Sequence, residues 1–264
     1  MNNPISLHEI PYEIIDNLGI VEDIRFPRQG HTSDVGIIES TKGCFIIKRT
    51  KGEQYCSWLS QEIHVLNCLR NTKLPVPTVY QVVEHNNENE SWALLQYFEG
   101  ETLRQALFNE KNTDKKHEMI FNFGVKLSNI HSTPCPNELM GDSVWLDEML
   151  RRAQFNLKRY SVDGTPDLLE FLEHNKPLPI ENKLIHGDFT IDNVLVRDGK
   201  ITSIIDWSGG GFGDPRYDIS LAIRPKPNAF EIESEIDTFF EGYGKKILSE
   251  QEYKYFEDGL YSFF

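Results

Sequence analysis

The chain of 264 residues contains 39% hydrophobic and 26% charged residues, a balance typical of globular proteins rather than of disordered or fibrous ones. Its formal net charge of −14 repels nucleic acids and anionic membranes, so neither is expected as a partner. No apolar run approaches the roughly 20 residues of a membrane span, and the first residues do not resemble a signal peptide. These features predict a cytoplasmic protein, and they indicate no obligate protein partner.

The four cysteines predict neither a disulfide framework nor a zinc site. None of them forms a Cys-x-x-Cys pair, and no pair of histidines stands near them at zinc-ligand spacing. Reduced thiols with a structural role are therefore expected.

The first hundred residues predict a β-rich part around one helix. Apolar residues three and four positions apart predict the helix over residues 53–70. Apolar and β-branched residues predict strands over residues 21–26, 35–39, 44–49, 78–84 and 92–98. The polar turn over residues 40–43 predicts a hairpin between the second and third of these strands.

The remainder of the chain is predicted to be mostly helical. Thr113 is expected to cap a helix that runs to about residue 131. Further helices are predicted over residues 142–160, 166–174, 217–223, 230–243 and 249–263, and short strands over residues 193–197 and 201–205. The sequence therefore predicts an α+β protein with a small β-rich lobe over residues 1–98, net charge −4, and a larger, mostly helical lobe over residues 99–264, net charge −10.

One segment has the residue types that phosphoryl transfer needs. Asp188 and Asn193 lie on a short loop that begins after the apolar residues 184–185 and ends where a predicted strand begins, and Asp206 follows at the end of the next apolar strand. One carboxylate of such a set accepts the proton of the attacking hydroxyl, while a second carboxylate and an amide oxygen hold Mg²⁺ on the nucleotide phosphates. Either aspartate alone would favour a turn residue at a strand end, and the combined spacing with Asn193 reverses this in favour of the catalytic interpretation.

The first part of the chain supplies a basic partner for this set. Lys48 ends a predicted strand, and Glu62 lies on the apolar stripe of the next helix. A carboxylate in that position is costly unless it is paired, which makes Lys48 its expected partner. Upstream, the turn with Gly30, Thr32 and Ser33 is suited to cover phosphates, although most such turns only connect hairpin strands.

These residues resemble the aminoglycoside phosphotransferase family, which has a bilobal protein-kinase-like fold with a small antiparallel sheet and one helix in its N-terminal lobe and a larger, mostly helical C-terminal lobe. Residues 185–193 match the family pattern His-Gly-Asp-x-x-x-x-Asn, and residues 96–103, 130–133, 198–206 and 213–221 are similar to further family motifs. The length and the closing Phe-Phe look most like the branch that phosphorylates the 3′-hydroxyl of aminoglycosides. That branch tends to end with an acidic pair just before its last two residues, and here those positions hold Tyr261 and Ser262.

The resemblance implies that residues 1–98 form the nucleotide-binding lobe and residues 99–264 the catalytic and substrate-binding lobe, and it implies a role for each matching residue. Asp188 would be the catalytic base, Asn193 and Asp206 would bind Mg²⁺, and Lys48, held by Glu62, would contact the phosphates of ATP or GTP. The Gln96 carbonyl and the Phe98 amide would meet the adenine edge, and Asp218 would brace the catalytic loop.

The acceptor is expected to be a small cationic molecule with a hydroxyl group, with an aminoglycoside as the first candidate. Candidate substrate contacts in the acidic part of the chain are Asp147, Glu148, Arg224, Glu257, Asp258 and Phe264. A macrolide, an amino alcohol or a sugar is the alternative acceptor. A protein kinase is disfavoured because only seven residues separate Asp206 from Asp214, and a catalytically inactive protein is disfavoured because all the expected site residues are present.

Overall fold

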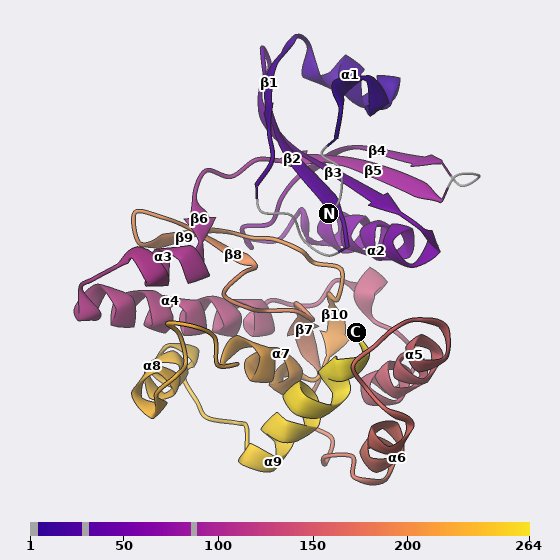
Figure 1. The fold of residues 1–264 in the computed structure, drawn as a ribbon. Coiled ribbons are helices and arrows are strands. Elements are labelled where there is room, and N and C mark those ends of the chain that lie inside the picture. Colours follow the sequence, from indigo (N-terminus) through magenta and orange to yellow (C-terminus); the bar gives the residue numbers. More distant parts are fainter. Residues whose placement is uncertain (1–4, 28–31, 86–88) are drawn as a thin grey trace. The chain divides into compact units, whose positions relative to one another are not determined.

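The computed structural model describes residues 5–27, 32–85 and 89–264. The chain forms two compact units (Figure 1). The N-terminal unit comprises Met1–Glu99 together with Ser203–Ser208, and the C-terminal unit comprises Gly100–Thr202 and Gly209–Phe264. In the described part of the chain, no helix has both the length and the apolar composition that crossing a membrane requires.

An antiparallel sheet forms the centre of the N-terminal unit. Its strands are β1 (Val21–Arg25), β2 (Asp34–Ser40), β3 (Gly43–Lys51), β4 (Val79–His85) and β5 (Glu90–Gln96), in the order β1-β2-β3-β5-β4. Ser40 pairs with Gly43, so only two residues connect β2 to β3. The five strands predicted from the sequence are all present, each with bounds that differ by at most two residues.

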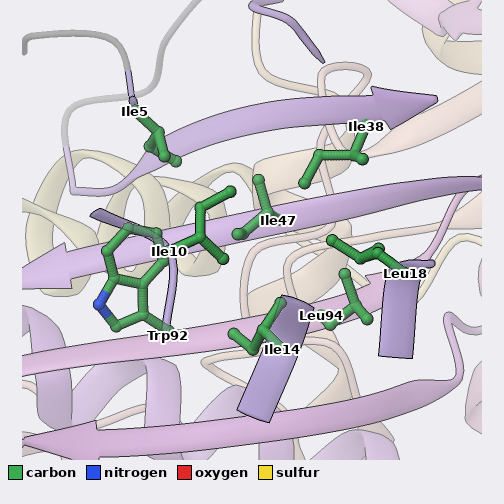
Figure 2. Packing of buried hydrophobic residues seen from close by; sticks show 8 residues of the cluster. All are labelled: Ile5, Ile10, Ile14, Leu18, Ile38, Ile47, Trp92 and Leu94. Carbon is green, nitrogen blue, oxygen red and sulfur yellow. The ribbon is translucent and has the colours of Figure 1, made fainter. Parts of the chain in front are cut away.

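The two faces of this sheet contact different parts of the unit because side chains alternate along a strand. Ile47 of β3 faces the short helix α1 (Tyr12–Leu18), and Figure 2 shows it within a buried cluster. The members of that cluster are Ile5, Ile10, Ile14, Leu18, Ile38, Ile47, Trp92 and Leu94. The next residue, Lys48, faces the long helix α2 (Glu53–Leu69) and bonds to it. Helix α1 was not predicted, since its seven residues bury only Ile14 and Leu18.

Helices make up most of the C-terminal unit. They are α3 (Leu103–Asn109), α4 (Thr113–Ser132), α5 (Trp145–Arg159), α6 (Pro166–His174), α7 (Pro215–Ala222), α8 (Glu233–Tyr243) and α9 (Glu250–Tyr253). Helices α4 and α8 lie side by side (Figure 1) and approach closely at two glycines. A Cβ atom on Gly124 would lie 2.1 Å from the Phe239 carbonyl oxygen, and one on Gly242 would lie 2.0 Å from that of Phe121.

Short strands complete the C-terminal unit and position the loop of residues 186–193. They are β6 (Glu101–Thr102), β7 (Lys183–Ile185), β8 (Val194–Arg197), β9 (Lys200–Ile204) and β10 (Gly211–Gly213). β6, β8 and β9 form one small sheet, and β7 pairs with β10 in another. The loop of residues 186–193 thus runs from the end of β7 to the start of β8.

Several helix ends differ from the sequence prediction, and α8 begins at Glu233, three residues after its predicted start. The cap of α4 is Asn112 rather than Thr113, because the Asn112 side-chain oxygen accepts the backbone N–H groups of Asp114 and Lys115. Helix α5 begins at Trp145, three residues after the predicted start. The last predicted helix is interrupted: α9 is followed by a π-helical turn (Lys254–Gly259) and a 3-10 turn (Leu260–Phe263).

Candidate active site

The loop of residues 186–193 is fixed by its own buried side chains. Phe189 is fully buried and stacks on Phe123 of α4, with ring centroids 4.6 Å apart. His186 is also buried, and its Nδ1 accepts the backbone N–H of Asp188 at 3.2 Å. Gly187 has φ 82, and a Cβ atom there would lie 2.2 Å from the Gly209 carbonyl oxygen, so only glycine fits.

Asp218 on α7 holds the backbone of this loop. Its Oδ2 accepts the N–H of His186 and its Oδ1 accepts the N–H of Gly187, each at 2.7 Å. The Nε2 atom of His131 lies 3.3 Å from the same Oδ2, and the Nδ1 atom of His131 lies 2.8 Å from the Tyr243 hydroxyl. A fully buried carboxylate with two backbone donors is a rigid anchor, which is the bracing position that the family resemblance implies.

Within the loop, the side chain of Asn193 forms hydrogen bonds to Asp188. The Nδ2 amide of Asn193 donates to the backbone oxygen of Asp188 and to its Oδ2, both at 2.8 Å. The other carboxylate oxygen of Asp188 accepts the hydroxyl of Tyr261 at 3.2 Å. Because Asn193 uses its amide nitrogen in these bonds, its Oδ1 is the atom suited to act as a metal ligand.

Two residues that the sequence analysis did not assign contact the loop. Arg104 on α3 forms an ion pair with Asp192, and its backbone N–H donates to the Ile191 carbonyl at 3.0 Å. Tyr261, in the 3-10 turn near the C-terminus, donates to Asp188. Two features of the sequence draw attention to these contacts: Asp192 lies inside the loop motif, and Tyr261 stands where the similar branch tends to have an acid. Neither signal identifies the partner, because the contacts join residues far apart in the sequence.

The N-terminal unit brings together Lys48, Glu62 and Asp206. The Nζ atom of Lys48 lies 2.8 and 2.9 Å from the two oxygens of Glu62 and 3.7 Å from Oδ1 of Asp206. Burial by itself lowers the pKa of Lys48, but the two carboxylates outweigh it, so the net shift is upward. Lys48 therefore remains charged over the whole physiological pH range.

Asp206 owes its position to the segment Ser203–Ser208, which belongs to the N-terminal unit although β9 leads into it. The backbone N–H of Ile204 and the Ser203 hydroxyl both donate to the Pro75 carbonyl, at 2.9 and 3.2 Å. The buried Trp207 ring donates its N–H to the Ile204 carbonyl. Asp206 itself has φ 65, an uncommon conformation for a residue with a side chain that often marks a functional site.

The predicted nucleotide contacts fall at the edges of the sheet. Thr32 and Ser33 immediately precede β2, while Gly30 lies outside the described residues. Gln96 is the last residue of β5, and its Oε1 accepts the Thr78 hydroxyl at 2.9 Å. Phe98 follows two residues later, and its backbone N–H donates to none of the described residues.

The acids predicted to bind substrate amines mostly have basic partners of their own. Asp147 pairs with Lys176 and Glu148 pairs with Arg151, both at 2.6 Å. Glu257 forms an ion pair with Arg224, itself one of the candidate substrate contacts. Burial raises the pKa of Glu257, and the adjacent Asp258 raises it further, against the effect of Arg224.

The last of these candidates, Phe264, lies at the end of a segment that contacts α5 and Gly164. Arg152 lies over the Phe264 ring, 5.4 Å from its centroid. The preceding Phe263 carbonyl accepts the Asn156 amide at 2.9 Å, and the Ser262 carbonyl accepts the Gly164 N–H at 2.8 Å.

The chain matches the model of a known protein family. The model of the phosphotransferase enzyme family matches residues 23–254. The chain belongs to this family. The match includes the loop with Asp188, the ion pair of Lys48 with Glu62, and Asp206. The predicted class of enzyme, a phosphotransferase, is thereby confirmed.

The chain is also similar to individual relatives and to solved structures. An aminoglycoside 3′-phosphotransferase of Enterococcus faecalis is 28% identical over 187 residues, which cover 66% of this chain and 68% of the relative. One from Niallia circulans is 25% identical over 266 residues and covers 95% and 96% of the two chains. The ternary complex of streptomycin, ATP and the phosphotransferase APH(2″)-IIa has a TM-score of 0.67 at 19% identity, covering 96% of this chain and 88% of the other. This likeness confirms the predicted fold.

Proposed function

We propose that this member of the phosphotransferase enzyme family transfers the γ-phosphate of ATP to a hydroxyl group of a small molecule. The observation that carries the proposal is the loop on which Asn193 holds the Asp188 carboxylate while Asp218 holds the backbone. A carboxylate fixed in this way is suited to accept a proton from an incoming hydroxyl. GTP is the alternative phosphate donor.

In the proposed reaction, Asp188 accepts the proton of the acceptor hydroxyl. The hydroxyl oxygen forms a bond to the γ-phosphorus, the bond from that phosphorus to the bridging oxygen breaks, and the electron pair leaves with ADP. Asn193 keeps Oδ2 of Asp188 in place, and the opposite oxygen, Oδ1, faces the Tyr261 hydroxyl. Most of the rate enhancement in such reactions comes from positioning and charge stabilisation.

The residues of the chain fit a nucleotide with Mg²⁺. Lys48 is charged and fixed by Glu62, so its ammonium group is suited to bind phosphate oxygens. Thr32 and Ser33 would add hydroxyl contacts to phosphates, and the Phe98 N–H and Gln96 carbonyl would bind the adenine edge.

Asn193 and Asp206 provide the hard oxygen ligands that Mg²⁺ prefers, and side-chain atoms of Asp206 are 45% exposed. When bound, Mg²⁺ would neutralise the charge of the phosphates.

An aminoglycoside is the first candidate acceptor. Two of the relatives that cover most or all of this chain are named aminoglycoside 3′-phosphotransferases. A fold neighbour is named in complex with streptomycin and ATP. The net charge of −10 over residues 99–264 favours a cationic acceptor as well.

A less highly charged acceptor is the second candidate, and the ion pairs in the structure favour it. Asp147, Glu148 and Glu257 each already have a basic partner, so each attracts a further ammonium group less strongly. A macrolide or an amino alcohol with a single amine needs fewer such contacts, and a neutral sugar needs none.

Nucleotide turnover with a panel of acceptors tests the proposal. The purified protein is incubated with Mg²⁺ and ATP, or with GTP, and an aminoglycoside, a macrolide, an amino alcohol or a sugar, and ADP or GDP formation is followed. We expect turnover above the acceptor-free rate, with an aminoglycoside as the best acceptor, and a phosphorylated product visible by mass spectrometry. Turnover with a macrolide, an amino alcohol or a sugar but not with an aminoglycoside would favour the second candidate, and none with any acceptor would contradict the proposal.

A further inference from the structure

Both oxygens of the Asp188 carboxylate are held by hydrogen bonds from residues of the C-terminal unit. Asn193 donates to Oδ2 at 2.8 Å, and the Tyr261 hydroxyl donates to Oδ1 at 3.2 Å. Two donors on opposite oxygens fix the rotation of the carboxylate plane, which one donor alone does not. Each carboxylate oxygen has a second lone pair, so the carboxylate can still accept the proton of an incoming hydroxyl.

Tyr261 is itself held in place from two sides. The Arg224 guanidinium lies over the Tyr261 ring, 4.8 Å from its centroid, and Glu257 forms an ion pair with Arg224. The residue after Tyr261 is anchored, because the Ser262 carbonyl accepts the Gly164 N–H. The tyrosine therefore does not depend on Asp188 for its own position.

The Tyr261 hydroxyl acts as a hydrogen-bond donor to Asp188. Burial raises the pKa of Tyr261, and the negative charge of Asp188 raises it further, while Arg224 partly opposes the shift. The phenol thus stays protonated at neutral pH and does not compete with Asp188 as a base.

We propose that Tyr261 is a positioning residue that orients the Asp188 carboxylate for the acceptor hydroxyl. The inference rests on the proposed role of Asp188 as the base. It assigns a function to a position where the similar branch tends to have an acid, and it makes the C-terminal turn part of the machinery around the base. Arg224 and Glu257 act on the reaction through Tyr261 rather than by binding substrate amines.

Fluorine NMR tests the contact without any acceptor. 3-Fluorotyrosine is placed at position 261, and its ¹⁹F resonance is compared in the wild-type protein, in Asp188→Asn and in Asp237→Asn, which removes an exposed acid of α8. We expect the resonance to move in Asp188→Asn and to stay in Asp237→Asn. An unchanged resonance in Asp188→Asn would overturn the contact and the inference, whatever the enzyme phosphorylates.

Kinetics test the positioning role. Tyr261→Phe keeps the ring under Arg224 but removes the hydroxyl, and we expect kcat to fall about tenfold while KM for ATP changes less than about twofold. Tyr160→Phe removes a hydroxyl from a ring that packs on Phe155 and leaves kcat unchanged. Equal kcat in Tyr261→Phe and wild type would overturn the role. A wild-type protein without phosphoryl transfer would instead overturn the proposed function and with it the catalytic part of the inference.

Discussion

The ammonium group of Lys48 lies between the two carboxylate oxygens of Glu62, at 2.8 and 2.9 Å, on the face of the sheet that contacts α2. Side-chain atoms of Glu62 are only 4% exposed, so this carboxylate has lost most of its hydration. A buried charge of this kind is tolerated because its partner is fixed beside it. The same contact holds Lys48 in one orientation, which the proposed phosphate contact requires.

Removal of Lys48 is expected to affect stability as well as nucleotide binding. Lys48→Ala leaves the Glu62 carboxylate buried without its partner, and we expect a loss of about 3 kcal/mol in the free energy of unfolding. Chemical denaturation measures this loss, and calorimetry with Mg·ATP measures the accompanying loss of affinity.

The double variant Lys48→Met with Glu62→Gln separates these two effects. It removes both charges, and we expect it to recover most of the stability lost in Lys48→Ala while nucleotide affinity stays low. If the double variant bound Mg·ATP like the wild type, Lys48 would not be a phosphate contact.

Asp206→Ala is expected to remove the dependence of nucleotide affinity on Mg²⁺. The reason is that Asp206 supplies the carboxylate proposed as a metal ligand, and it also lies 3.7 Å from Lys48. Calorimetry with ATP, with and without Mg²⁺, distinguishes this effect from a general weakening. Asp258→Ala is the control, and Mg²⁺ should enhance ATP binding by this variant as in the wild type. The same enhancement in Asp206→Ala would show that Asp206 is not a ligand.

Local sequence patterns predicted most of the fold. The sheet strands follow from runs of apolar and β-branched residues, and helix α2 follows from apolar residues three and four positions apart. The pairing of Lys48 with Glu62 was predicted for the same reason, since an acid on an apolar stripe needs a partner. Asp188 and Asn193 were predicted from their spacing on one loop, and their contact is as close as that spacing suggests.

The contacts that the sequence did not predict join distant segments. Tyr261 and Asp188 are 73 residues apart, and no periodicity relates them. Arg104 and Asp192 lie 88 residues apart. The basic partners of Asp147 and Glu257 were not predicted, because the sequence pattern around an acid does not reveal whether it faces solvent or a basic residue. Such contacts depend on packing, which local patterns do not encode.

Asp218→Asn is expected to loosen the catalytic loop. In the wild type, the backbone N–H groups of His186 and Gly187 each donate to one oxygen of the Asp218 carboxylate. An asparagine side chain has only one oxygen, so one of these two donors loses its acceptor. We expect a loss of about 2 kcal/mol in stability and a fall in turnover of at least about tenfold. Denaturation and turnover are measured beside Asp237→Asn, and a variant as stable and active as this control would contradict the bracing role.

Thermal shifts distinguish the two candidate acceptor classes. With Mg·ADP present, an aminoglycoside such as streptomycin is expected to raise Tm, and to raise it less at high salt, because charge-assisted contacts at exposed groups are screened. A neutral sugar serves as the comparison. No shift with any of several aminoglycosides, beside a clear shift with a neutral acceptor, would favour the less charged acceptor instead.

The turnover of Asp188→Asn tests the central proposal most directly. The asparagine has nearly the same shape as the aspartate but does not accept a proton, so turnover is expected to fall by a factor of about 10²–10⁴. Calorimetry is expected to show Mg·ATP affinity close to that of the wild type, because the phosphate and metal contacts are assigned to other residues. A variant that binds nucleotide normally and keeps more than about a third of wild-type turnover would contradict the role of Asp188 as the base.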